Sequence, residues 1–270
     1  MDFIKDFILP AQEGVLFPPK KHSLVQLYNF NDLPLIAMNL IRIGAQVPGM
    51  ASEVGMHPMV KKSIDSNQGG AINAVVGFGP MLWILVTPDA PTRGGFHSFD
   101  EIEINGIEVP ETEGDMFLYF SSDYAELNRI LASEIKEHFG RDAHLIEERV
   151  FEGDDHSYIL SEKEKVLIEK SINLDTMDSS FALAQNFKTN DEYLCDLPHH
   201  SFSGSVDSGL GRYAITFSNQ PKLLEEHSES VSQPPISRGV FFVPSLGLLT
   251  SLRMGGIRMG SLAINAKWKE

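Results

Sequence analysis

The spacing of apolar residues predicts a first helix over Asn31–Ile43. Its apolar residues recur every three or four positions, as they do on one face of a helix. Asn31 or Asp32 can cap its start, and Pro34 suits its first turn. Gly44 follows directly and is expected to end it. The apolar face comprises Leu33, Ile36, Leu40 and Ile43.

A second helix is predicted over Asp123–Phe139, where the same spacing is clearer. Ser122 or Asp123 is expected to cap its start, and Gly140 to end it. The apolar side comprises Leu127, Ile130, Leu131, Ile135 and Phe139.

Runs of apolar and β-branched residues bounded by turn residues predict strands on both sides of these helices. In the first half they are Ser23–Phe30, the run Ala74–Trp83 that a glycine turn interrupts, Thr112–Phe120 and Ala143–Phe151. The order is therefore β-α-β-β-α-β, the ferredoxin-like pattern. The second half repeats this pattern incompletely, with strands Phe181–Phe187, Arg212–Ser218 and Val240–Val243 and a helix over Gln220–Ser228.

The segment Gly239–Leu249 (GVFFVPSLGLL) is an apolar strand that stops at a proline and turns into a short apolar segment. Three further segments precede it in order: Gln12–Pro18, Ala74–Trp83 with its Gly-Phe-Gly turn, and Thr112–Phe120. This ordered set resembles the dye-decolorizing (DyP-type) peroxidase family. The resemblance covers Gln12–Arg149 and, less closely, Gly209–Leu249.

The resemblance implies an α+β fold in which two tandem ferredoxin-like halves form a barrel of antiparallel sheets with helices outside. We assign residues 1–155 to the N-terminal half, 156–178 to a helical connector, 179–252 to a shortened C-terminal half and 253–270 to a tail. The connector is expected because Ser161 and Glu164 form a capping box at the start of a charged helix.

Composition narrows the classes of partner. The formal net charge of −15 argues against binding to a phosphate backbone, which requires a basic surface. A single cysteine, Cys195, excludes an intrachain disulfide and indicates a reducing compartment. Since no apolar run approaches the length of a membrane span, we expect a cytoplasmic protein with no membrane or nucleic-acid partner.

In the resembled family the catalytic centre is a haem, whose iron needs a neutral imidazole ligand. His199 and His200 lie between two predicted strands of the second half, where the resemblance places this ligand, so one of the two is the candidate. A histidine pair in a loop rich in proline and serine is also typical of a solvated surface.

On the side of the haem where peroxide would bind, the candidate acids for proton transfer are Asp207 and Asp154. The candidate cation is Arg212. The family's G-x-x-D-G loop is missing after the strand that ends near Phe151, and the stretch from Phe181 to Phe241 is short. A solvated turn or loop is the more common explanation for either aspartate, and an arginine at the edge of a strand more often extends into solvent.

The tail contains spaced apolar residues among glycines, which suits an extended peptide that docks into a groove. Ile257–Leu262 resembles the cargo-loading peptide by which DyP-type peroxidases enter encapsulin shells, although Met259 replaces the usual isoleucine. The alternative is a last strand or helix packed on the body. The resemblance thus implies localisation inside an encapsulin compartment, and related barrels often form homo-oligomers.

Two hypotheses follow. In the first, the chain is a haem-dependent peroxidase that reduces peroxide and oxidises an unidentified electron donor. In the second, it is a haem-free, non-catalytic relative that acts as a binding or assembly protein, as the missing G-x-x-D-G loop favours.

Overall fold

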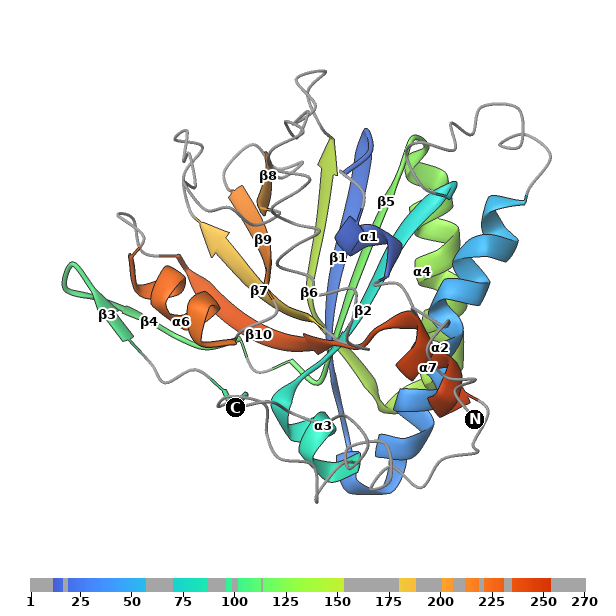
Figure 1. Ribbon diagram of the computed structural model, residues 1–270, viewed down its shortest axis with the longest axis horizontal. Coiled ribbons are helices and arrows are strands. Elements are labelled where there is room, and N and C mark those ends of the chain that lie inside the picture. Colours follow the sequence, from blue (N-terminus) through green and yellow to red (C-terminus); the bar gives the residue numbers. More distant parts are fainter. Residues whose placement is uncertain are drawn as a thin grey trace, which may run out of the picture.

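Eight described strands form one curled sheet, a half-barrel (Figure 1). The computed structural model describes residues 12–16, 19–56, 70–86, 96–98, 102–112, 114–152, 180–187, 201–205, 212–218, 221–230 and 235–253. The strands are β1 His22–Phe30, β2 Ile72–Phe78, β5 Met116–Ser122, β6 Ala143–Glu152, β7 Ser180–Phe187, β8 Ser201–Ser205, β9 Arg212–Ser218 and β10 Ser237–Val243.

The strand order shows that the sheet is a tandem repeat. It runs β6-β1-β5-β2-β10-β7-β9-β8, and all described neighbours are antiparallel. Numbered within each half, both β6-β1-β5-β2 and β10-β7-β9-β8 read 4-1-3-2, which is the ferredoxin-like order. The halves meet where Phe242 of β10 pairs with Phe78 of β2. The predicted α+β fold of two ferredoxin-like halves is therefore confirmed.

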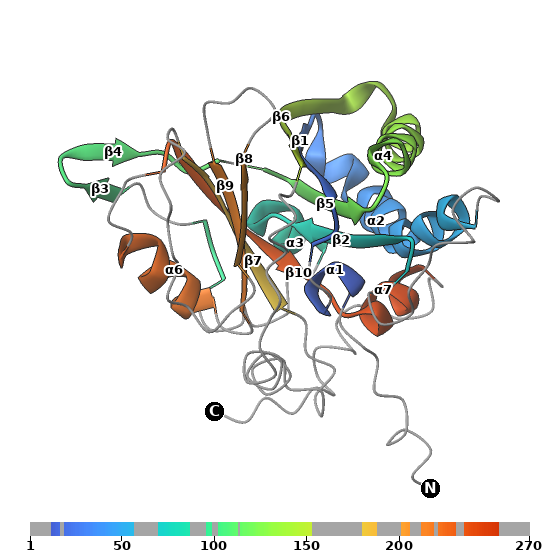
Figure 2. The same ribbon diagram turned by 90° about the horizontal axis from the view of Figure 1, so that it is seen from above.

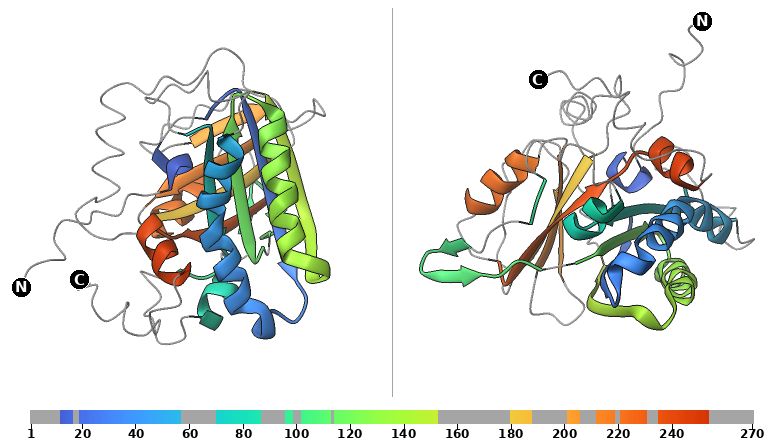
Figure 3. Two further views of the ribbon diagram at one scale, coloured as in Figure 1. Left: turned by 90° about the vertical axis from the view of Figure 1, so that its right-hand side faces the viewer. Right: turned by 90° about the horizontal axis from the view of Figure 1, so that it is seen from below.

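Helices cover the convex face of the half-barrel (Figures 2 and 3). In the first half they are α2 Leu33–Gly55 and α4 Ala125–Phe139, with α7 Leu246–Arg253 beside α2. The second half has α6 Pro221–Ser230, and α3 Pro80–Val86, which follows β2 in the first half, contacts both α2 and β10. The other described elements are α1 Glu13–Leu16, a 3₁₀ turn Gly140–Asp142 and a projecting hairpin of β3 Ile102–Ile104 and β4 Ile107–Val109. No described helix combines the length and hydropathy that crossing a membrane requires.

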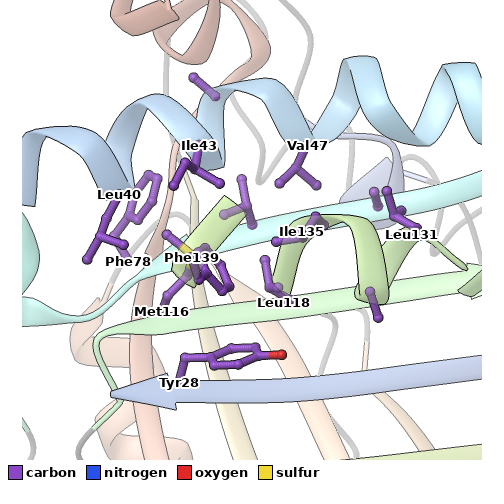
Figure 4. Close-up of a cluster of buried hydrophobic side chains, with 14 of the residues drawn as sticks. Tyr28, Leu40, Ile43, Val47, Phe78, Met116, Leu118, Leu131, Ile135 and Phe139 are labelled. Carbon is purple, nitrogen blue, oxygen red and sulfur yellow. The ribbon is translucent and has the colours of Figure 1, made fainter. Parts of the chain in front are cut away.

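The first helix is longer than predicted. It continues past Gly44 and through Pro48 to Gly55. Gly44 is buried against β2, and a Cβ added there would lie 2.7 Å from the Phe78 ring. The glycine therefore permits close contact between helix and sheet and does not end the helix. Figure 4 shows the core that this contact creates between α2, α4 and the sheet.

The predicted caps are only partly correct. Asp32 occupies the N-cap position of α2 and Tyr124 that of α4, and neither side chain makes a capping hydrogen bond. Gly140 ends α4 with a φ of 72°, as predicted. Ile130 was assigned to the apolar side of α4 but is 45% exposed. Fewer of the apolar positions assigned to this side of the helix are buried than their spacing predicts.

Strand β8 and the β3–β4 hairpin were not predicted. Strand β8 has the sequence SFSGS, which contains one large apolar residue and therefore lacks a strand-like pattern. The hairpin turns at Asn105-Gly106, where both φ angles are positive, as a tight two-residue turn requires.

Candidate functional site

The concave face of the half-barrel is the surface on which the two halves face each other. Alternate residues of each strand point to it, because side chains alternate along a strand. Its apolar residues form one cluster, each at most 4% exposed. They are Val15 from α1, then Val25, Leu27, Val75, Phe117, Tyr119, Phe151, Ala182, Ala184, Tyr213, Ile215, Phe217, Phe241 and Val243.

Aromatic stacking fills this face at the junction of the halves. Phe117 of β5 and Phe241 of β10 stack with ring centroids 5.1 Å apart and planes 21° apart. They lie over Gly77 of β2, where an added Cβ would be 3.0 Å from Cβ of Phe241 and 3.3 Å from the Phe117 ring. The missing side chain of Gly77 thus provides the space in which the two rings meet.

The seam is the second junction, where β6 of the first half faces β7 and β9 of the second. There the ring centroids of Phe151 and Tyr213 are 5.8 Å apart. Nearby, Nδ2 of Asn186 donates a 2.8 Å hydrogen bond to Oε1 of Glu147, which also lies 3.0 Å from the Arg149 guanidinium. The two halves are therefore in direct side-chain contact across the seam.

Burial controls the electrostatics of the seam. It raises the pKa of the Glu147 carboxyl above its usual value, and Arg149 and the Asn186 hydrogen bond only partly oppose this effect. The pKa of Tyr213 lies well above its ordinary value, because burial disfavours the phenolate and the Glu147 charge repels it. Tyr213 therefore keeps its proton over the physiological range.

Most predicted site residues lie outside the described residues. These are His199, His200, Asp154, Asp207 and the tail segment Ile257–Leu262. Arg212 begins β9, as predicted, and its backbone pairs with Phe187 of β7 and Ser205 of β8.

The described side chains show no haem ligand, and the candidates His199 and His200 lie outside the described residues. His22 is half-buried and His97, His138 and His144 are exposed, so none of these four imidazoles is enclosed by the concave face. A flat macrocycle between two side chains would hold them about 7 Å apart, twice a carbon–carbon contact. The Phe151 and Tyr213 rings are closer than this. Within the described ranges no group of three His, Cys, Asp or Glu residues could hold a metal ion.

Comparison with solved structures agrees with the architecture. The encapsulated DyP-type peroxidase from Mycobacterium smegmatis matches with a TM-score of 0.68 and 13% identity, over 89% of this chain and 97% of that chain. A dye-decolorizing peroxidase from Bacteroides thetaiotaomicron matches with a TM-score of 0.66 and 15% identity, over 92% and 100%. The chain has the DyP-type peroxidase fold.

A third match is a DypB variant from Rhodococcus jostii RHA1 in complex with heme, with a TM-score of 0.66 and 15% identity over 88% of this chain and 97% of that chain. No protein-family model and no curated protein matches the chain. At these identities the likeness establishes the fold alone.

The seam residues were not predicted as a site; they are Glu147, Arg149, Asn186 and Tyr213. All four lie on predicted strands, but local sequence pattern does not determine which strands come together. Glu147 and Asn186 are 39 positions apart and belong to different halves, so their contact depends on how the sheet curls. The Glu-Glu-Arg run in the middle of β6 was the one available signal.

Proposed function

We propose that this chain is a haem-free protein of the DyP-type fold that acts as a binding or assembly protein. The direct contact between Phe151 and Tyr213 across the seam carries the proposal, because a macrocycle cannot lie between two rings whose centroids are 5.8 Å apart. The missing G-x-x-D-G loop supports it, because in the resembled family this loop supplies the acid on the peroxide-binding side of the haem.

A haem-dependent peroxidase is the second candidate, and the heme complex of the Rhodococcus DypB variant supports it. In that case His199 or His200 would ligate the iron, and Asp207 or Asp154 with Arg212 would serve the peroxide side. Haem would supply the redox chemistry, and the electron donor stays unidentified.

A single preparation of the protein distinguishes the haem-free protein from the peroxidase. The protein is produced with haem precursor and purified, and its Soret absorbance, iron content and cooperative thermal unfolding are measured. We expect cooperative unfolding without a Soret band and without turnover of a dye and peroxide. A Soret band that persists through purification and is lost in the double variant His199→Ala/His200→Ala would replace the proposal with the peroxidase.

We also propose that Ile257–Leu262 directs the chain into an encapsulin shell. Its resemblance to a cargo-loading peptide and the shared fold with the encapsulated Mycobacterium peroxidase support this assignment. Co-expression with an encapsulin shell protein tests it. We expect the full chain to co-purify with shells and a chain lacking residues 253–270 to remain outside them. Equal loading of both chains would contradict the assignment.

A further inference from the structure

The seam is held by side chains. In the described sheet, β6 pairs only with β1, and β8 pairs only with β9, so these are the two edge strands. The edges approach one another as the sheet curls, but no described backbone ladder joins them. The seam can therefore open without breaking a described strand pair, whereas separation at β2 and β10 would break the sheet.

Glu147 occupies the polar centre of this seam. Its side chain is 8% exposed, and its carboxylate accepts the hydrogen bond from Asn186 of the other half. Arg149, on the same strand, is 32% exposed on its side chain, so solvent screens part of its attraction for the carboxylate. Burial of a carboxylate without full compensation favours its protonated form.

Among the described side chains, few other charged groups face Glu147. Tyr213 of β9 is protonated and neutral, Asn186 of β7 is uncharged, and the β8 sequence SFSGS contains no titratable residue. On β1, Leu27 lies opposite Glu147. Glu148 points to the other face of the sheet, where it accepts a 2.6 Å hydrogen bond from Gln26. The protonation state of Glu147 therefore sets the local charge balance, with Arg149 as its one described counter-charge.

We propose that Glu147 is a proton-controlled latch on the seam. The protonated carboxyl keeps the two halves in contact, and its ionisation loosens the seam and opens access to Phe151 and Tyr213. The direction follows from linkage: a carboxyl that prefers its proton in the closed state contributes full stability below its unfolded pKa, and this is lost as pH rises through the raised pKa. Each unit by which the closed state raises the Glu147 pKa corresponds to about a tenfold change in the equilibrium constant for opening.

Hydrogen exchange of the full-length protein tests the latch. Protection factors, corrected for the intrinsic rate at each pH, are measured by mass spectrometry for peptides from β6 and β9 between mildly acidic and neutral pH. In the unaltered chain we expect protection of both strands to fall as pH rises and then to level off. Glu147→Gln keeps an oxygen acceptor for Asn186 and Arg149 without the charge, so its protection should stay high and independent of pH.

Two further variants make the result decisive. Glu148→Gln is the matched control on the opposite face and should keep the pH dependence. Asn186→Ala removes the hydrogen bond across the seam, so it should lower protection at every pH. Protection should still fall as pH rises in this variant. The latch is overturned if protection in the unaltered chain does not change with pH, or if Glu148→Gln abolishes the slope as completely as Glu147→Gln.

Discussion

The side chain of Gln12 donates a 2.9 Å hydrogen bond to the backbone carbonyl of Pro244, 232 positions away. The same amide nitrogen donates to the carbonyl of Val76 at 2.9 Å, and the Val76 N–H donates to Oε1 of Gln12 at 2.7 Å. Three of the segments that suggested a family resemblance therefore meet at one buried amide. The order of these segments in the sequence therefore indicates a structural junction between the two halves. It does not by itself indicate a catalytic centre.

Replacing Gln12 with alanine should destabilise the protein by about 3 kcal/mol, because the buried backbone groups of Val76 and Pro244 lose their partner. Urea unfolding followed by circular dichroism measures the change. Asn39→Ala, at an exposed position of α2, is the control and should change stability by less than about 0.5 kcal/mol. Equal effects from the two variants would argue against the junction.

Gly79→Ala should be among the most damaging glycine substitutions. A Cβ at this position would lie 1.9 Å from the carbonyl oxygen of Gly114, so the backbone must move to accept it. We expect a loss of about 3 kcal/mol or more, the upper range for overpacking. Gly106→Ala meets no atom within 4 Å but has a φ of +78°, so about 1 kcal/mol of strain is expected. Midpoints of urea unfolding compare the two, and a smaller effect at Gly79 would refute the argument.

Phe151→Ala should cost about 3–5 kcal/mol, since the ring is 2% exposed and packs across the seam on Tyr213. Ile130→Ala provides the comparison within the same half, because this side chain is 45% exposed despite its place in the apolar pattern. Its effect should be several-fold smaller. Thermal unfolding of both variants tests the burial assigned to each, and similar losses would contradict it.

Alkaline unfolding should depend on Tyr119. Burial raises its pKa from 10.0 to about 12, against the lowering effect of the Ser23 and Ser121 hydroxyls. The folded state therefore prefers the neutral phenol, and its contribution of about 3 kcal/mol is lost as pH rises from 10 towards 12.

The variant Tyr119→Phe should weaken the pH dependence of unfolding in that range. Tyr124→Phe, at a side chain that is 44% exposed, should leave it unchanged. A pH profile that is the same in Tyr119→Phe and the unaltered chain would show that this tyrosine does not ionise on unfolding.

Local pattern predicted most of the elements. The α4 stripe, the strands around it and the strand that ends at Pro244 all follow from side-chain periodicity and from residues that stop a helix or a ladder. The same reasoning was wrong at Gly44. The sequence pattern predicts that the helix ends there, whereas in the structure the helix continues and Gly44 permits contact with Phe78. A glycine has the same sequence signature in both roles, and only the neighbouring sheet distinguishes them.

The sequence by itself therefore determined the ferredoxin-like order of helices and strands, because periodicity of 2 or 3.6 residues is a local property. The tertiary structure alone decided that β8 completes the second half and that the sheet curls until Glu147 meets Asn186. It also decided that aromatic rings occupy the concave face. Such contacts join residues whose distance along the chain carries no information about their distance in space.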